Sequence, residues 1–161
     1  MIAIRTFVLL CLAVAIPVVG TVAATEAAPD HDAIRHVLMS TFDKPEARLV
    51  VDPVAVSGEY AIAGWSQGDM GGRALMRKKG HAWEIVLCAG DDLKKADVLI
   101  KVGLPAAAAN SLATNLAAEE AKLAPDRLSL FSKFEGMVMV SGDSQHGPAQ
   151  PAGHHPHGHK P

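Results

Sequence analysis

The middle of the chain, residues 49–88, holds four short apolar stretches that are separated only by glycine-containing connections. The stretches are residues 49–56, 60–67, 73–78 and 81–88, and the connections are Ser57-Gly58, residues 68–72 and Lys79-Gly80. Connections this short join antiparallel strands, because a parallel pair needs a crossover of about a dozen residues or more. The sequence therefore predicts a four-stranded antiparallel β-meander. Pro53 places the first strand at an edge of the sheet or at a bulge.

Helical patterns lie on both sides of this predicted sheet. Before it, Asp30 suits the N-cap of a helix over residues 30–42. Its apolar residues recur at helical spacing: Ile34, Val37, Leu38 and Phe42. After the sheet, Asp91 suits the N-cap of a helix over residues 91–102, with Gly103 at its C′ position. The residues expected on its inner side are Leu93, Ala96, Leu99 and Ile100.

Two prolines mark the starts of the remaining helices. Pro105 opens an alanine-rich helix that runs to about residue 123, and Pro125 opens another that ends at Gly136. Residues 137–140 suit a last short strand. We therefore expect an α+β fold with an N-terminal helix, a four-stranded antiparallel β-meander, C-terminal helices and a disordered His-rich tail.

Alternation in the fourth predicted strand assigns its side chains to two faces. One face takes His81, Trp83, Ile85 and Leu87, and the other takes Ala82, Glu84, Val86 and Cys88. Trp83 is expected in the core. Cys88, at the end of the strand, is expected to be buried, and it cannot pair with His81 across the strand because the two point to opposite faces.

The N-terminus has the order of a secretory signal peptide. Arg5 precedes a long apolar run over residues 6–19, and small residues follow at 20–24. Cleavage after Ala23 or Ala24 fits this pattern, which divides the chain into a signal peptide (1–24), one α+β domain (25–140) and a His-rich tail (141–161). The alternative is an uncleaved anchor, but Pro17 and a run shorter than about 18–20 residues argue against one. We expect the exported form not to be embedded in a membrane.

Charge and motifs exclude several classes of function. The formal net charge is −2, so no basic surface for nucleic acid is implied. The motifs His-Glu-x-x-His and Gly-x-Ser-x-Gly are missing, as are a phosphate loop and a dinucleotide fingerprint. We therefore expect no enzymatic activity. Once the signal peptide is removed, Cys88 is the only cysteine, which leaves three roles open: a buried residue, a metal ligand or an intermolecular thiol.

Five of the eight histidines lie in the last part of the chain. They are His146, His154, His155, His157 and His159. Proline and glycine separate them and no large apolar residue accompanies them, so this stretch cannot join a core. Several neutral imidazoles at high local concentration bind copper(II) most strongly and also accept zinc or nickel. The alternative is an uninformative tail.

Methionine is the second candidate ligand. Met137 and Met139 have the i, i+2 spacing that places both thioethers on one side of a strand, just before the His-rich tail. Thioethers are soft ligands that suit copper(I). Met70 lies in a glycine-rich segment and is unlike a core residue. The alternative for all three is ordinary gap-filling methionine.

Three stretches of the chain resemble one family. They are residues 32–39 with 42–46, residues 64–75, which include Gly64-Trp65-Ser66-Gln67-Gly68-Asp69-Met70-Gly71-Gly72, and residues 77–88, which include Gly80-His81-Ala82-Trp83-Glu84. With the His-rich C-terminus, they are similar to small exported proteobacterial proteins described as copper-uptake-system-associated proteins. The resemblance implies a periplasmic role near copper acquisition, beside a copper-uptake receptor or periplasmic copper carriers. It carries over no ligand set.

The sequence thus predicts a periplasmic copper-binding accessory protein that takes part in copper uptake or delivery. Its predicted partners are a metal ion and either the uptake receptor or a copper carrier. The alternative is a periplasmic protein-interaction or small-molecule-binding module whose tail only buffers metal.

Overall fold

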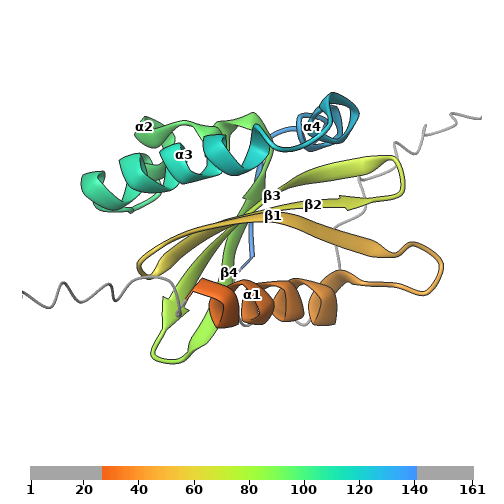
Figure 1. Ribbon diagram of the computed structural model, residues 1–161, viewed down its shortest axis with the longest axis horizontal. Helices are drawn as coiled ribbons and strands as arrows, with labels where there is room; N and C mark the ends of the chain where they lie inside the picture. Colours follow the sequence, from red (N-terminus) through yellow and green to blue (C-terminus); the bar gives the residue numbers. More distant parts are fainter. Residues whose placement is uncertain (1–26, 141–161) are drawn as a thin grey trace, which may run out of the picture.

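The computed structural model describes residues 27–140 and has an α+β fold (Figure 1). Its elements in chain order are α1 (Ala27–Phe42), β1 (Leu49–Ser57), β2 (Tyr60–Gln67), β3 (Met70–Lys79), β4 (Ala82–Ala89), the 3₁₀ helix η1 (Asp91–Lys94), α2 (Ala96–Lys101), α3 (Ala106–Glu120), α4 (Pro125–Phe131) and β5 (Met137–Met139). The strands form one antiparallel sheet in the order β1-β2-β3-β4-β5. The predicted four-stranded meander is confirmed, and β5 adds a fifth strand to it. The predicted signal peptide and His-rich tail lie outside the described residues.

Helices cover both faces of the sheet. α1 lies on one face, and α2, α3 and α4 lie on the other (Figure 1). The first face buries Ile34 and Leu38 of α1, as their helical spacing predicts, against Met76 and Trp83. The second face buries residues of α2 and α3 against the sheet, namely Leu99, Leu112 and Leu116 against Ile62 and Leu75. The core is therefore divided into two layers by the sheet. None of the helices within residues 27–140 has the length and apolar character needed to cross a bilayer.

Strand β3 begins earlier than predicted. The segment 68–72 is expected to be a connection, whereas the strand starts at Met70 and includes Gly71 and Gly72. These glycines are needed for close packing: a Cβ at Gly71 would lie 3.0 Å from Leu130, and one at Gly72 would lie 2.9 Å from Cζ2 of Trp65. Glycine therefore marks a strand that other groups approach closely, instead of a loop.

A β-bulge changes the faces of β4. Leu75 pairs with Leu87 but Met76 pairs with Ile85, so Val86 is an extra residue in β4. Trp83, Ile85 and Cys88 consequently all face α1, while Leu87 faces the other helices. The predicted alternation is correct up to Ile85 and wrong for Leu87 and Cys88. His81 lies in the preceding turn and is exposed.

The first predicted N-cap has a different role. Asp30 lies inside α1, where its Oδ1 accepts hydrogen bonds from Lys78 Nζ (2.8 Å) and Trp83 Nε1 (3.1 Å). Burial alone would raise the pKa of Asp30, but these hydrogen bonds and the charge of Lys78 outweigh it and hold the pKa below its usual value. Asp30 therefore links α1 to the β3–β4 hairpin through Lys78 and Trp83.

The second predicted N-cap, Asp91, joins a buried ion pair. Arg73 of β3 makes two hydrogen bonds to Glu120 of α3, Nε to Oε1 at 2.6 Å and Nη2 to Oε2 at 3.1 Å. Its Nη1 donates to Asp91 Oδ1 at 3.1 Å, and the guanidinium lies over the ring of Phe131 at 5.4 Å from the centroid. Arg73 and Glu120 are both buried. The single helix predicted over residues 91–102 is wrong: η1 and α2 take its place, because Lys95 between them is extended, with φ −100° and ψ 119°. Ile100, which that helix placed inward, is exposed.

Other helix boundaries agree with the sequence. Pro105 and Pro125 lie at the starts of α3 and α4, and Gly103 follows α2 with a φ of +102°, as a C′ glycine does. α4 ends at Phe131, earlier than the Gly136 boundary that the sequence predicted. Pro53 lies in the edge strand β1, where the register shifts between Val51 and Val54, as predicted.

Replacing Trp83 with Ala should lower the free energy of unfolding by about 3–5 kcal/mol, because a buried indole is lost and a cavity remains. The side chain is 4% exposed, so little of that loss is regained by solvation. Chemical denaturation monitored by circular dichroism measures the change. A loss below about 1 kcal/mol would show that the Trp83 site is not a packed core position.

Glu120→Gln should destabilise the fold by about 3 kcal/mol, because it leaves the buried Arg73 guanidinium without its main counter-charge. This loss of stability is at the low end of what removing one partner of a buried ion pair costs, because Asp91 still contacts Arg73. Glu119→Gln is the matched control: Glu119 pairs with Lys122, whose side chain is 65% exposed, and should change stability by less than about 0.5 kcal/mol. Equal effects of the two substitutions would contradict the structural role of Glu120.

Candidate metal site

Strand β5 forms one edge of the sheet. It pairs with β4 in the register Leu87↔Met139, Cys88↔Val138 and Ala89↔Met137. The N–H of Val140 donates to the carbonyl of Val86 at 2.9 Å, which continues this ladder one residue further. Residues that face each other in an antiparallel pair point to the same face of a sheet. The side chains of β5 can therefore be assigned from those of β4.

The two candidate methionine ligands share one face. Met137 and Met139 lie opposite Ala89 and Leu87, on the face that carries α2 and α3. Their side chains are 38% and 64% exposed, so neither thioether is used as core. The i, i+2 spacing thus produces two accessible thioethers beside each other, and the gap-filling alternative does not apply to this pair. Met70, the third methionine considered, is exposed at the start of β3.

The candidate imidazole ligands lie outside the described residues. They are His146, His154, His155, His157 and His159. His146 follows Met139 by seven positions in the sequence. The two predicted ligand sets are therefore neighbours along the chain.

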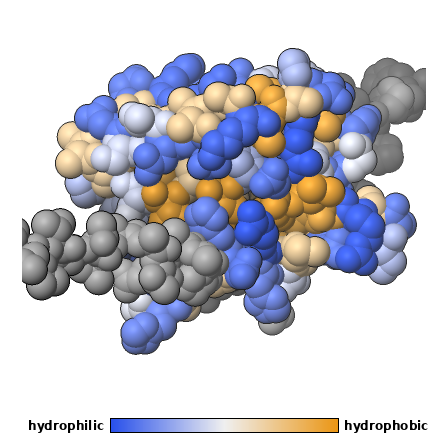
Figure 2. Space-filling model, in the orientation of Figure 1, coloured by the Kyte–Doolittle hydropathy of each residue, from blue (hydrophilic) through white to orange (hydrophobic). Residues whose placement is uncertain are grey.

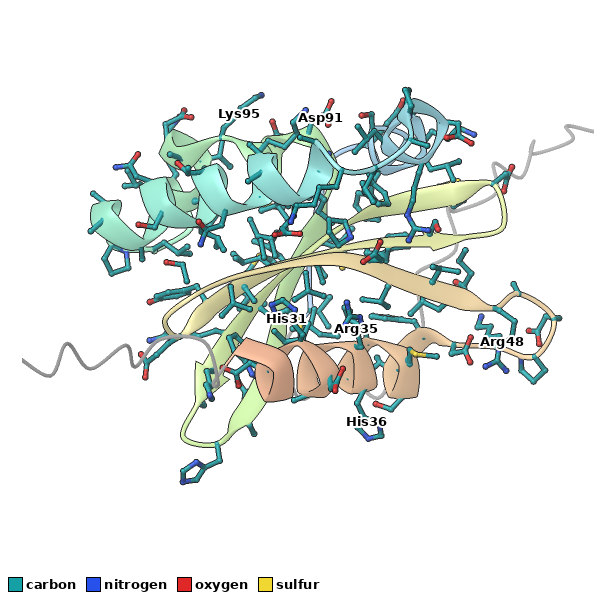
Figure 3. All side chains as sticks on the ribbon, viewed as in Figure 1. His31, Arg35, His36, Arg48, Asp91 and Lys95 are labelled. Carbon is teal, nitrogen blue, oxygen red and sulfur yellow. The ribbon has the colours of Figure 1, made fainter. Side chains whose placement is uncertain are left out.

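The remaining histidines do not form a second site. His31 and His36 lie on α1, and His81 lies in the β3–β4 turn. His31 is half-buried, whereas His36 is exposed and its ring points away from the sheet (Figure 3). Asp32, one helical turn before His36, forms an ion pair with Arg35. Within residues 27–140, no three His, Cys, Asp or Glu side chains are grouped so that they could hold a metal ion.

Cys88 is separated from the methionines. It is buried, as predicted, and it faces α1, whereas Met137 and Met139 lie on the opposite face of the sheet. Burial raises the pKa of its thiol to about 11, so the thiolate that binds metals is scarce at neutral pH. Of the three roles that the sequence left open for Cys88, the structure supports the buried residue.

An open groove of about 280 Å³ lies next to Met139, between the sheet and the segment that connects α2 to α3. Its polar residues are Tyr60, Arg77, Lys79 and Glu84. Arg77 lies over the ring of Tyr60 at 5.8 Å from the centroid, and Lys79 Nζ contacts Glu84 Oε2 at 2.8 Å. The groove depends on the observed register, which pairs Tyr60 with Arg77 and Arg77 with Glu84. The connections predicted at residues 68–72 and 79–80 imply other pairs, so the sequence did not predict the groove.

Comparison of the chain with protein-family models, with curated proteins and with solved structures found no match. The family resemblance therefore stays a prediction.

The Cys88 thiol should react slowly with iodoacetamide at pH 8 in the native protein and rapidly in denaturant. The reason is its burial and the raised pKa, which together hide the sulfur and suppress the thiolate. Intact-mass measurement over time gives both rates. Native modification as fast as that of the denatured chain would mean that Cys88 is accessible, and would return it to the list of candidate ligands.

Proposed function

We propose that this chain is a periplasmic copper-binding accessory protein that serves copper uptake or delivery. One observation carries the proposal: two exposed thioethers lie on one face of the edge strand β5, directly before the only stretch of the chain that is dense in histidine. An exposed methionine places apolar surface in water and adds nothing to the core. The position of this adjacent pair therefore favours a role in binding. The export signal and the family resemblance predicted from the sequence support the same conclusion.

The two ligand sets suit different oxidation states of copper. The thioethers of Met137 and Met139 suit copper(I), and the imidazoles of His146, His154, His155, His157 and His159 suit copper(II). The same imidazoles accept zinc or nickel, so preference for copper rests on its intrinsically higher affinity for nitrogen ligands. A chain with both sets can hold copper whichever state reaches it. We assign it no catalytic step and no nucleic-acid partner.

Delivery requires a second protein to receive the metal. We propose a copper-uptake receptor or a periplasmic copper carrier as that partner. Ligands at a sheet edge, such as Met137 and Met139, are accessible to another protein, whereas a metal buried between the helices would not be. The proposed role therefore places metal binding at the periphery of the fold.

The groove beside Met139 favours the alternative function, a module that binds a small molecule or a peptide while the tail buffers metal. Its arginine, lysine and glutamate alternate with apolar residues, which is a mixture typical of ligand sites, but its volume is at the lower limit for one. The alternative predicts that the groove residues matter more than the histidines. Arg77→Ala tests it, because that change should abolish ligand or partner binding in the alternative and leave copper binding unchanged.

Replacing His154, His155, His157 and His159 with Ala should remove most copper(II) binding at neutral pH, because these four form the only dense cluster of imidazoles in the sequence. Binding by the unmodified chain should also weaken between about pH 7 and 5, since protons compete for imidazole near pH 6.5. Isothermal titration with copper(II), zinc and nickel measures both effects.

The control for this experiment replaces His31, His36 and His81, which lie apart on the folded domain, and should leave copper(II) affinity unchanged. If the quadruple variant keeps the copper(II) affinity of the unmodified chain, the tail is not the site. The proposal for copper(II) would then be wrong.

A further inference from the structure

The two edges of the sheet differ in a way that bears on how copper(I) is held. At the β1 edge, side chains from three helices donate hydrogen bonds to backbone carbonyls of the strand. The bonds are Arg35 to Val51 O (3.3 Å), Arg127 to Asp52 O (3.0 Å) and Asn115 to Val56 O (2.9 Å). Pro53 and the register shift interrupt the same strand. These are the devices by which proteins prevent edge strands from pairing with other chains.

The β5 edge has no such protection within the described residues. Because Val140 bonds to β4, the alternation of an antiparallel ladder turns the N–H and C=O groups of Met137 and Met139 away from β4. No described side chain donates to or accepts from these groups, and β4 is the one strand that pairs with β5 between residues 27 and 140. The strand carries no charge and no proline. It can therefore accept another strand.

The sequence of β5 is complementary to itself. In an antiparallel pair centred on Val138, Met137 of one copy lies opposite Met139 of the other, and the outward backbone groups of both methionines form about four hydrogen bonds. A two-fold axis at Val138 gives both copies the same set of hydrogen bonds, as an isologous interface requires. A second copy of the chain is therefore sufficient to complete the pairing.

This pairing also completes a ligand set. Met137 and Met139 of one copy supply only two thioethers, whereas the paired strands bring together four on the same face of the joined sheet. Directly opposite Cβ atoms lie about 5 Å apart and diagonal neighbours about 7–8 Å, a span that four flexible methionine side chains can close around one ion. Soft thioethers select copper(I) among the biological first-row ions.

We infer that two copies of this chain pair through β5 in the presence of copper(I) and hold one ion between Met137 and Met139 of both copies. The inference rests on the proposed copper function and names the site for the reduced ion. A three-residue strand gives far less contact than the roughly 1,200 Å² of a stable interface, so the metal-free chain stays monomeric at micromolar concentration. Copper(I) is thus the condition for pairing.

Val138→Lys tests the pairing without removing a ligand. Val138 is 53% exposed, so the fold tolerates the lysine, but in the dimer two lysines would lie directly opposite each other at the axis. Val50→Lys is the matched control, because Val50 is a similarly exposed valine (46%) on the protected edge strand β1, where apolar residues also reach the surface (Figure 2). Both variants are made in the full exported chain with His154, His155, His157 and His159 replaced by Ala, so that the tail does not bind the ion.

Sedimentation velocity with copper(I), supplied anaerobically from a chromophoric chelator, gives oligomeric state, stoichiometry and affinity together. We expect the parent and the Val50→Lys variant to dimerise with one copper(I) per two chains. The Val138→Lys variant should stay monomeric and bind copper(I) at least about tenfold more weakly. Met137→Leu with Met139→Leu should abolish both copper(I) binding and dimerisation. Thermal unfolding of each variant confirms that the fold is retained.

Three results would overturn the inference. They are dimerisation of the Val138→Lys variant like that of the parent, one-to-one binding of copper(I) by a monomeric parent, and a parent that binds no copper(I). None of these results touches copper(II) binding by the histidines, which is measured separately on the chain with its tail intact. Failure of the shared thioether site is therefore distinguishable from failure of the proposed function.

Discussion

The ion pair between Arg73 and Glu120 determines how the second half of the chain meets the sheet. A guanidinium that is 1% exposed is tolerated only with close counter-charges, and here Glu120 supplies a bidentate one and Asp91 a second. Asp91 begins the helical segment that leaves β4, and Glu120 ends its longest helix. Ser132, just after α4, also donates to Asp91 at 3.0 Å. One buried arginine thus contacts the start, the middle and the end of the helical segment that connects β4 to β5.

This arrangement explains why β5 returns beside β4. The chain leaves the sheet at Asp91, and the contacts of Ser132 with Asp91 and of Phe131 with Arg73 bring it back to the same end of the strand. Gly90 has no room for a Cβ, which would lie 2.4 Å from the carbonyl oxygen of Phe134, so the outgoing and returning segments are in close contact there. From this point β5 can only run antiparallel to β4. The exposed methionines therefore owe their position to an ion pair that is buried on the same face of the sheet.

The sequence predicted most of the elements because local signals define them. Strand β2 and the starts of α3 and α4 follow from turn residues and prolines, and the stripe of α1 follows from its spacing. What the sequence could not predict depends on pairs of segments. The bulge at Val86 exists only in the register between β3 and β4, and Arg73 and Glu120 are 47 positions apart. Likewise, the spacing of Met137 and Met139 indicated a shared face, but the contrast between the two sheet edges depends on arginines and an asparagine that come from distant helices.

Metal binding by the two proposed ligand sets would depend differently on pH. Imidazole must lose a proton to bind metal, whereas a thioether has none to lose. As the pH falls, the proposed histidine set would release copper(II), whereas the affinity of the proposed methionine set for copper(I) would not change. Acidification alone would therefore only free copper(II), and its transfer to the thioethers would also require an external reductant that supplies one electron per ion. Because the network around Arg73 positions the last strand, a copper(I) ion held by the proposed methionine set would occupy a defined place on the surface, where a partner protein could recognise the fold and the metal together.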